Sequence, residues 1–230
     1  MPAHIVSVNI GLPRDEEWAG SLKRTAIKKD RVTGPVAVRT RGLDGDQVAD
    51  TKDHGGTYQA VYAFAQEDLD FWTEQLGERV APAVFGENLT TSGIDVNEAL
   101  LGERWRIGTA LLEVVDVRIP CSVFKNWLGV SGFDNTAWVK RFAAEGRPGP
   151  YLRVLEEGIL QAGDPIVVEH KPSHDVTVTM MFKAFMTDRS LLPRLLEVDR
   201  LSPQVHDDAR KYLASLSREE RPHRLESVPE

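Results

Sequence analysis

The chain contains one cysteine in 230 residues, Cys121, and this side chain could do the widest range of chemistry. It follows Val117-Arg118-Ile119-Pro120, where a strongly apolar run stops at a proline. One sulfur forms no internal disulfide, no four-cysteine zinc site and no protein-held iron–sulfur cluster. Two interpretations stay open. Cys121 is either a small buried hydrophobe, or a thiolate ligand or nucleophile with Arg118 as a source of positive potential.

Three other segments concentrate glycine with polar residues, each at a junction between predicted elements. Paired glycines leave backbone N–H groups open to an anion, but Gly-Asp and Gly-Gly also mark ordinary tight turns. For His54, a structural hydrogen-bonding role stands beside a functional one. The segments are Arg41-Gly42-Leu43-Asp44-Gly45-Asp46, Asp53-His54-Gly55-Gly56 and Phe85-Gly86-Glu87-Asn88-Leu89.

Short β-strands must position these side chains. Residues 5–10 alternate between apolar and polar, and the apolar run 108–120 ends where Pro120 can no longer donate a ladder hydrogen bond. Cys121 is therefore expected just past a strand. Further strands are predicted at 36–38, 60–64, 151–155 and 165–169.

Two helices are predicted among these strands. Residues 67–76 have apolar side chains at helical spacing and end at a Gly77 C-cap, and Asp134 or Asn135 caps a helix that runs to about residue 144. Many short strands, two inserted helices and no repeating βαβ order favour a mostly-β domain that is closed or sandwich-like.

The boundary of this domain is predicted at Lys171-Pro172-Ser173. Beyond it, residues 176–186, 190–198 and 203–216 have helical spacing and almost no glycine, which predicts a three-helix segment over 171–216. Its nearly balanced charge favours a packing role over DNA binding. Residues 217–230 are predicted to be a flexible polar tail.

The composition, 41% hydrophobic and 27% charged with a net charge of -7, is that of an ordinary enzyme-sized chain. The acidic balance argues against a nucleic-acid polymer as partner. No apolar run approaches the ~20 residues that cross a bilayer, and no secretory signal is evident, so we expect no membrane association. The single thiol fits a cytoplasmic location.

Taken in order, the motifs resemble the MOSC domain, a family named for the C-terminal region of molybdenum cofactor sulfurases. They look most like the stand-alone bacterial subgroup with a C-terminal three-helix domain, similar to proteins that confer resistance to N-hydroxylated purines such as 6-hydroxylaminopurine. The matching motifs are Gly42-Leu43-Asp44-Gly45-Asp46, His54-Gly55-Gly56 with Ala60-Val61-Tyr62, Phe85-Gly86-Glu87-Asn88-Leu89, Gly108, Arg118-Ile119-Pro120-Cys121 and Gly146-Arg147-Pro148-Gly149-Pro150-Tyr151.

The resemblance implies a mostly-β, MOSC-type β-barrel with a few inserted helices over 1–170, followed by a small three-helix domain. It implies that the chain binds the molybdenum cofactor (molybdopterin) and that Cys121 is the catalytic thiolate ligand of molybdenum. A soft sulfur donor suits a metal that the pterin already holds through sulfur, so one protein ligand is enough. The other implied cofactor-binding residues are His54, Gly55, Gly56, Glu87, Asn88, Arg118 and Arg147.

The chain departs from the family pattern at one place. Relatives often place Asp plus Lys or Arg directly after His-Gly-Gly, whereas this chain has Thr57-Tyr58-Gln59. A basic contact to the cofactor phosphate is therefore expected to come from another residue.

By the same resemblance, the expected activity is the reduction of small N-hydroxylated compounds, with molybdenum cycling between Mo(IV) and Mo(VI). No nucleotide-binding Gly-x-Gly-x-x-Gly motif follows a strand, so electrons are expected from a separate flavin or iron–sulfur protein. Two alternatives are a sulfur carrier with a Cys121 persulfide and a non-catalytic cofactor-binding protein. A homodimer is compatible with such a barrel.

Overall fold

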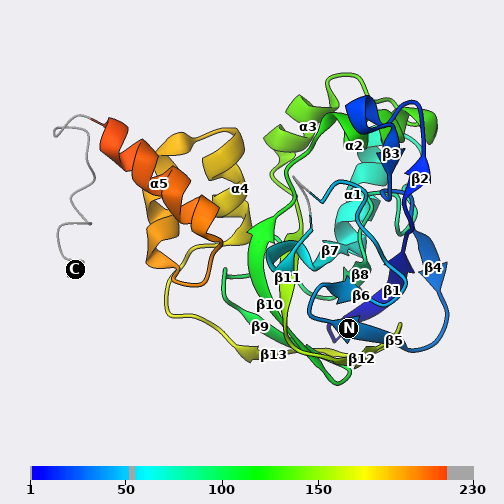
Figure 1. The fold of residues 1–230 in the computed structure, drawn as a ribbon, viewed down its shortest axis with the longest axis horizontal. Coiled ribbons are helices and arrows are strands. Elements are labelled where there is room, and N and C mark those ends of the chain that lie inside the picture. The colour runs from blue at the N-terminus through cyan, green and yellow to red at the C-terminus, as the bar shows by residue number, and fades with distance from the viewer. Residues whose placement is uncertain (1, 52–54, 217–230) are drawn as a thin grey trace.

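A large mixed sheet forms the centre of the computed structural model, which describes residues 2–51 and 55–216 (Figure 1). Its strand order is β13-β9-β10-β11-β7-β8-β1-β4, and all neighbours are antiparallel except the parallel pair β7–β8. The strands are β1 (His4–Ile10), β4 (Asp30–Val32), β7 (Val61–Ala65), β8 (Leu89–Ser92), β9 (Arg104–Ile107), β10 (Ala110–Val117), β11 (Pro150–Glu156) and β13 (Ile166–His170).

Two small sheets flank the large one. One has the order β12-β5-β6, with β12 (Gly158–Leu160), β5 (Val36–Arg39) and β6 (Gly42–Leu43), and the other pairs β2 (Arg14–Asp15) with β3 (Arg24–Thr25). Short 3₁₀ turns occur at η1 (Gly20–Leu22) and η2 (Thr57–Gln59). The strands predicted at 5–10, 36–38, 60–64, 151–155 and 165–169 correspond to β1, β5, β7, β11 and β13.

The mostly-β class with inserted helices is confirmed, but the expected barrel is not a continuous one. In the described ranges, β13 meets β1 only at the His4–Pro165 bridge and the backbone hydrogen bonds beside it. The reason lies in β1, because its second half, Val8–Ile10, pairs with β4. Only the first residues of β1 are left to approach β13. The two strands therefore touch at one end, and within the described residues the sheet does not close into a complete barrel.

Helices α1 (Gln66–Leu76), α2 (Ser122–Val130) and α3 (Trp138–Glu145) lie together beside the sheet (Figure 1). Helix α1 ends at Gly77, whose φ of 71° confirms the predicted left-handed cap. An aromatic cluster, all of it buried, joins these helices to the sheet. Its members are Phe64, Trp72, Phe85, Phe124, Trp138 and Phe142.

Two features of these helices differ from the sequence prediction. Helix α3 begins at Trp138, after Ala137 at φ 50°, because Asp134 accepts the backbone N–H of Thr136 and forms a turn instead of a cap. Helix α2 was not predicted. Its first residues carry no capping side chain, and Cys121 itself is the N-cap residue, without a side-chain cap hydrogen bond.

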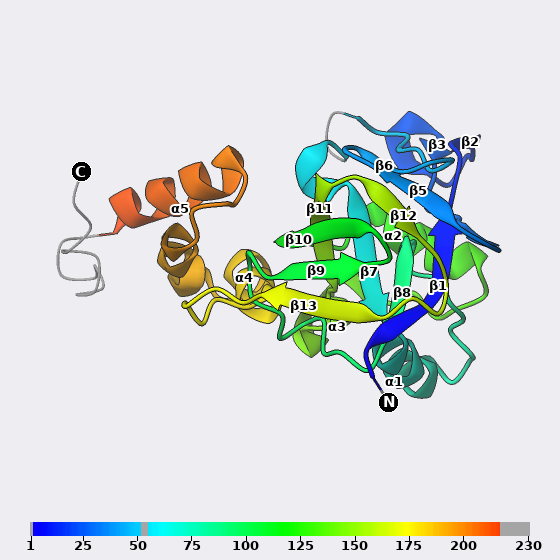
Figure 2. The ribbon, with the colours of Figure 1, turned by 90° about the horizontal axis from the view of Figure 1, so that it is seen from below.

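The three C-terminal helices lie at one end of the molecule, with α4 nearest to the sheet and α5 outermost (Figure 2). They are α4 (Val178–Met186), η3 (Arg189–Glu197) and α5 (Pro203–Ser215), and η3 is a 3₁₀ helix that contains Pro193. Phe182 of α4 meets Phe142 of α3 edge-on, 5.9 Å between ring centroids. The division into domains at residue 170 stays a prediction, and the tail 217–230 lies outside the described residues.

Within the described ranges, no helix combines the length and apolar character that would let it cross a membrane.

Candidate functional site

A cavity of about 360 Å³ brings together loops that are distant in the sequence. Four of the predicted site residues line it: Gly55, Asn88, Arg118 and Cys121. Other walls come from the segments around η1 and β3, from residues 46–50, and from Tyr62 and Tyr151. The volume lies within the range of ordinary small-molecule sites.

Cys121 lies between the end of β10 and the start of α2. Its side chain is half-buried and lines this cavity. The prediction that it follows a strand is confirmed. The structure adds that Cys121 occupies the N-cap position of α2, although its side chain makes no capping hydrogen bond. The N-terminus of a nine-residue helix carries partial positive charge. Together with Arg118, this charge surrounds the sulfur with positive potential.

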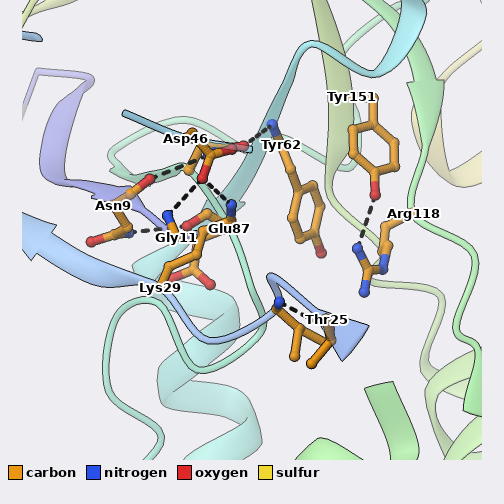
Figure 3. A network of polar contacts seen from close by, with 11 residues as sticks. Asn9, Gly11, Thr25, Lys29, Asp46, Tyr62, Glu87, Arg118 and Tyr151 are labelled. Carbon is orange, nitrogen blue, oxygen red and sulfur yellow. Dashed lines mark hydrogen bonds and ion pairs between the residues drawn. The ribbon is translucent and has the colours of Figure 1, made fainter. Parts of the chain in front are cut away.

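Arg118 is a cation on the cavity wall. Its guanidinium carbon lies 5.4 Å from the ring centroid of Tyr62 and 5.3 Å from that of Phe124, and its Nη1 donates to the hydroxyl of Tyr151 at 2.9 Å (Figure 3). Burial works to lower the pKa of Arg118, yet nearby Tyr151, Cys121 and Tyr62 raise it overall. The buried Nε has no hydrogen-bond partner among the described residues, and therefore remains available as a donor.

Lys29 provides a second cation on the cavity wall. Its Nζ lies 2.5 Å from Oδ1 of Asp46, and only 8% and 9% of the two side chains are exposed. The same carboxylate accepts the backbone N–H of Gly11 at 2.7 Å and the Nδ2 of Asn88 at 2.9 Å. Burial lowers the pKa of Lys29, and the charge of Asp46 opposes this shift. In Figure 3, Tyr62 lies between the Lys29–Asp46 pair and the Arg118–Tyr151 pair.

Asn88 and Glu87 support the floor of the first cavity, where their side chains hydrogen-bond to the backbone of neighbouring segments. Asn88 accepts the backbone N–H of Tyr62 through Oδ1 at 3.1 Å and donates to Asn9 O at 3.2 Å, while also lining the cavity. Glu87 is buried behind it and accepts the N–H of Ala83 at 2.5 Å. Burial raises the pKa of Glu87 to about 7, and its Oε2 has no partner within the described part of the chain.

A second, more open cavity of about 600 Å³ adjoins the first. Gly56, Tyr58, Asp116 and Ser202 line only this one, whereas Gln59 lines both. Gln59 accepts the N–H of Gly55 at 3.1 Å and donates to Asp116 at 3.2 Å. Burial raises the pKa of Asp116 to about 6. The residues shared by the two cavities are Arg41, Gln47, Val48, Gly55 and Gln59.

Three of the predicted site residues that the structure describes do not line the first cavity: Arg147, Gly56 and Glu87, which is buried behind Asn88. Arg147 lines neither cavity. It donates to Asp68 at 2.7 Å and lies 4.4 Å from the ring centroid of Phe71. Gly56 lines the second cavity, and His54 lies outside the described residues.

Sequence reasoning missed Lys29, Gln59 and Tyr151 as site residues. Lys29 stands in a polar stretch without a motif, and its role depends on the distant Asp46. Tyr151 was visible at the end of the Gly146–Tyr151 motif, and Gln59 was visible as a departure from the family pattern. In the described ranges, no three His, Cys, Asp or Glu side chains gather as a metal site.

Comparisons with known proteins give a family and a set of relatives for the chain. The family profile of the MOSC domain matches residues 50–167. YflK of Bacillus subtilis is 33% identical over 159 residues, covering 69% of this chain and 70% of that protein. YiiM of Escherichia coli is 32% identical over 160 residues, covering 68% of each chain.

A Gibberella moniliformis protein named as a reductase is 29% identical over 175 residues, which make up 74% of this chain but 30% of that protein. Among solved structures, YiiM from Geobacillus stearothermophilus has a TM-score of 0.76 and 26% identity, covering 92% of this chain and 100% of that one. YiiM from Escherichia coli, at a TM-score of 0.66 and 24% identity, covers 91% of this chain and 90% of its own, and shares the fold.

Proposed function

The chain belongs to the MOSC domain family, and from this premise we propose that it binds the molybdenum cofactor and reduces N-hydroxylated compounds. One observation carries the proposal: the only thiol of the chain lies on the wall of a cavity that also presents two partly buried cations, Arg118 and Lys29. A soft donor beside positive charge suits a thiolate-bound metal with an anionic cofactor.

The residues present fit this cofactor. Cys121 would supply the single protein ligand to molybdenum, because the pterin dithiolene supplies other sulfur donors. Arg118 has a buried Nε without a partner in the described residues, which suits it to an anionic oxygen such as that of the cofactor phosphate. Arg41 and the backbone N–H of Gly56 would add further donors, whereas the N–H of Gly55 already donates to Gln59.

The proposed reaction balances as follows: an N-hydroxylated substrate R–NH–OH takes up two electrons and two protons and yields R–NH₂ and water. The molybdenum centre supplies the two-electron redox chemistry when it is bound. We propose that a separate flavin or iron–sulfur protein reduces it, since a single cysteine holds no iron–sulfur cluster.

The chain's own groups handle the protons and orient the substrate. The Tyr151 hydroxyl accepts from Arg118 at 2.9 Å and so keeps its own O–H to donate. The carboxyl of Asp116, with its pKa raised to about 6, holds a proton over part of the working pH range beside Gln59.

The test compares wild-type protein with Cys121→Ala, both purified from a host that makes the cofactor. Wild type is expected to contain about one molybdenum per chain and to reduce 6-hydroxylaminopurine when a reductase is supplied, because Cys121 is the ligand. The variant is expected to lose the metal, or at least the activity. The molybdenum content per chain is measured by inductively coupled plasma mass spectrometry.

Ser131→Ala is the matched control, since Ser131 lies at the other end of α2 and lines neither cavity. Metal content and purine reduction both unchanged in Cys121→Ala would overturn the proposal. Sulfane sulfur on Cys121 without reduction would instead identify a sulfur carrier, and cofactor binding with neither activity a storage protein.

A further inference from the structure

The second cavity has walls from two parts of the chain that are far apart in sequence. Tyr58 and Gln59 come from η2, and Asp116 from β10, whereas Ser202 comes from the turn between the last two C-terminal helices. The cavity is therefore complete only when the C-terminal helical segment is in place.

One buried carboxylate ties these walls together. Glu113 on β10 is fully buried and lies opposite Arg104 on β9 and Arg153 on β11 in the sheet register. Its Oε2 accepts from Arg153 Nε at 2.6 Å, and its Oε1 lies 3.7 Å from Nη1 of Arg200. This one buried carboxylate therefore attracts an arginine of the sheet and an arginine of the C-terminal segment.

Two of the arginines around Glu113 each lie next to one wall of the second cavity. The guanidinium carbon of Arg153 lies 5.5 Å from the ring centroid of Tyr58, which places the aromatic wall. Arg200 precedes Ser202 by two residues, which places the C-terminal wall. The cluster is therefore a support for the shape of this cavity.

The chemistry of the lining points to a planar ligand with a polar edge. Tyr58 offers an aromatic ring for stacking, and the amide of Gln59 with the carboxyl of Asp116 offers adjacent donor and acceptor groups. An aliphatic hydroxylamine could hydrogen-bond to this polar pair but has no ring to stack on Tyr58. Because Gln59 and Gly55 line both cavities, a ring held here adjoins the cavity of Cys121.

We propose that the second cavity is the substrate subsite, in which Tyr58 stacks on a planar N-hydroxylated heteroaromatic ring and Gln59 with Asp116 bind its polar edge. The inference rests on the proposed function, and it gives the C-terminal segment a part in the substrate site through Ser202. It also assigns a use to Tyr58 and Gln59, two of the three residues that depart from the family pattern.

The first test is direct binding, which needs no turnover. 6-Hydroxylaminopurine is titrated by calorimetry into wild-type protein purified from the cofactor-competent host and into Tyr58→Ala. Loss of the stacked ring is expected to raise the dissociation constant about tenfold. Tyr58→Phe, which keeps the ring, is expected to change it by no more than about twofold. Asp116→Asn, which preserves side-chain shape, is expected to weaken binding as well.

Tyr212→Ala is the matched control. Tyr212 lies under Arg189 with the same 5.5 Å between guanidinium carbon and ring centroid, but it lines neither cavity. Its removal is expected to leave purine binding unchanged. Equal affinity of wild type, Tyr58→Ala and Asp116→Asn for the purine would overturn the inference.

The second test separates the subsite from the proposed reaction. With an active reductase system, Tyr58→Ala is expected to raise KM for 6-hydroxylaminopurine about tenfold and to leave KM for hydroxylamine, which has no ring, within about twofold. Equal losses for both substrates would contradict the subsite. Purine binding that depends on Tyr58 in a protein that reduces neither substrate would keep the subsite and refute the proposed function.

Discussion

Arg118 and Arg147 belong to motifs of similar appearance, yet they lie in regions with opposite electrostatic character. Each guanidinium lies close to an aromatic ring, that of Tyr62 for Arg118 and that of Phe71 for Arg147. Arg147 is neutralised by the carboxylate of Asp68, and its side chain is 41% exposed. Arg118 donates instead to a neutral hydroxyl, that of Tyr151. The partner of a cation, more than its motif, thus decides whether it can receive an anionic ligand.

The carboxylates of the two regions sharpen the contrast. Asp46 and Asp68 each bind one basic side chain and one asparagine amide. In the cavity region, Asp46 neutralises Lys29, whereas Arg118 forms no ion pair with a carboxylate of the described residues. In the region of Asp68, the single arginine is fully compensated. We therefore expect the first region to bind ligand and the second to stabilise the fold.

The largest expected effect contrasts two glycines with positive φ, one in a tightly packed place and one on a cavity rim. Gly149 has φ 68°, and a Cβ there would lie 2.4 Å from the carbonyl oxygen of Ala63. Gly149→Ala is expected to lower the free energy of unfolding by at least about 3 kcal/mol, because the backbone must shift as well as accept strain.

Gly56 has φ 78° on the rim of the second cavity, and among the described residues no atom lies within 4 Å of such a Cβ. Gly56→Ala is expected to lower the free energy of unfolding by only about 1 kcal/mol, from backbone strain alone. Urea denaturation of both variants measures the difference. Equal losses would show that the region of Gly149 is no more tightly packed than the cavity rim.

The next effect separates the two arginines by function. Arg118→Met is expected to lower the molybdenum content of purified protein by at least about tenfold, since a hydrogen bond to a charged group contributes about 1.5–3 kcal/mol. Arg147→Met is expected to retain the metal and to lower stability, because Asp68 is left buried without its counter-charge. Metal analysis and denaturation on the same samples test this. The comparison fails if Arg147→Met loses the metal while Arg118→Met keeps it.

The smallest effect is a pH dependence of stability that arises at the cavity floor. The pKa of Glu87 is raised from 4.5 to about 7 by burial, so the native state keeps a proton that the unfolded state releases. The free energy of unfolding therefore falls as pH rises through this window, by about 1 kcal/mol between about pH 6 and 7 from this group.

Glu87→Gln removes this contribution, so its stability is expected to fall less than that of wild type over the same interval. Asp68→Asn is the comparison from the other region. The pKa of Asp68 is also raised by burial, but its bonds to Arg147 and Asn97 oppose the shift, so the change in pH dependence is expected to be smaller. Denaturation at several pH values would contradict this assignment if Glu87→Gln kept the slope of wild type.

Much of the fold could be predicted because its signals are local. Alternation placed β1, the strand-ending Pro120 placed Cys121, and Gly77 marked the end of α1. Helix α2 could not be predicted in this way. It begins without a capping side chain, and it is held by tertiary packing of Phe124 against Phe85 and Trp138. Closure of the sheet likewise depends on how β1 divides its pairing between β4 and β13.

By itself, the sequence determined the single thiol, the strand that ends before it and the ordered motifs that identify the family, because each is carried by a few adjacent residues. Only the tertiary structure decided which polar residues meet that thiol. Lys29 lies in the cavity wall with Asp46, Arg118 has no carboxylate partner among the described residues, and Arg147 is bound by the buried Asp68 away from both cavities. The physical reason is that charge compensation depends on distances between residues far apart in the chain, which no local pattern records.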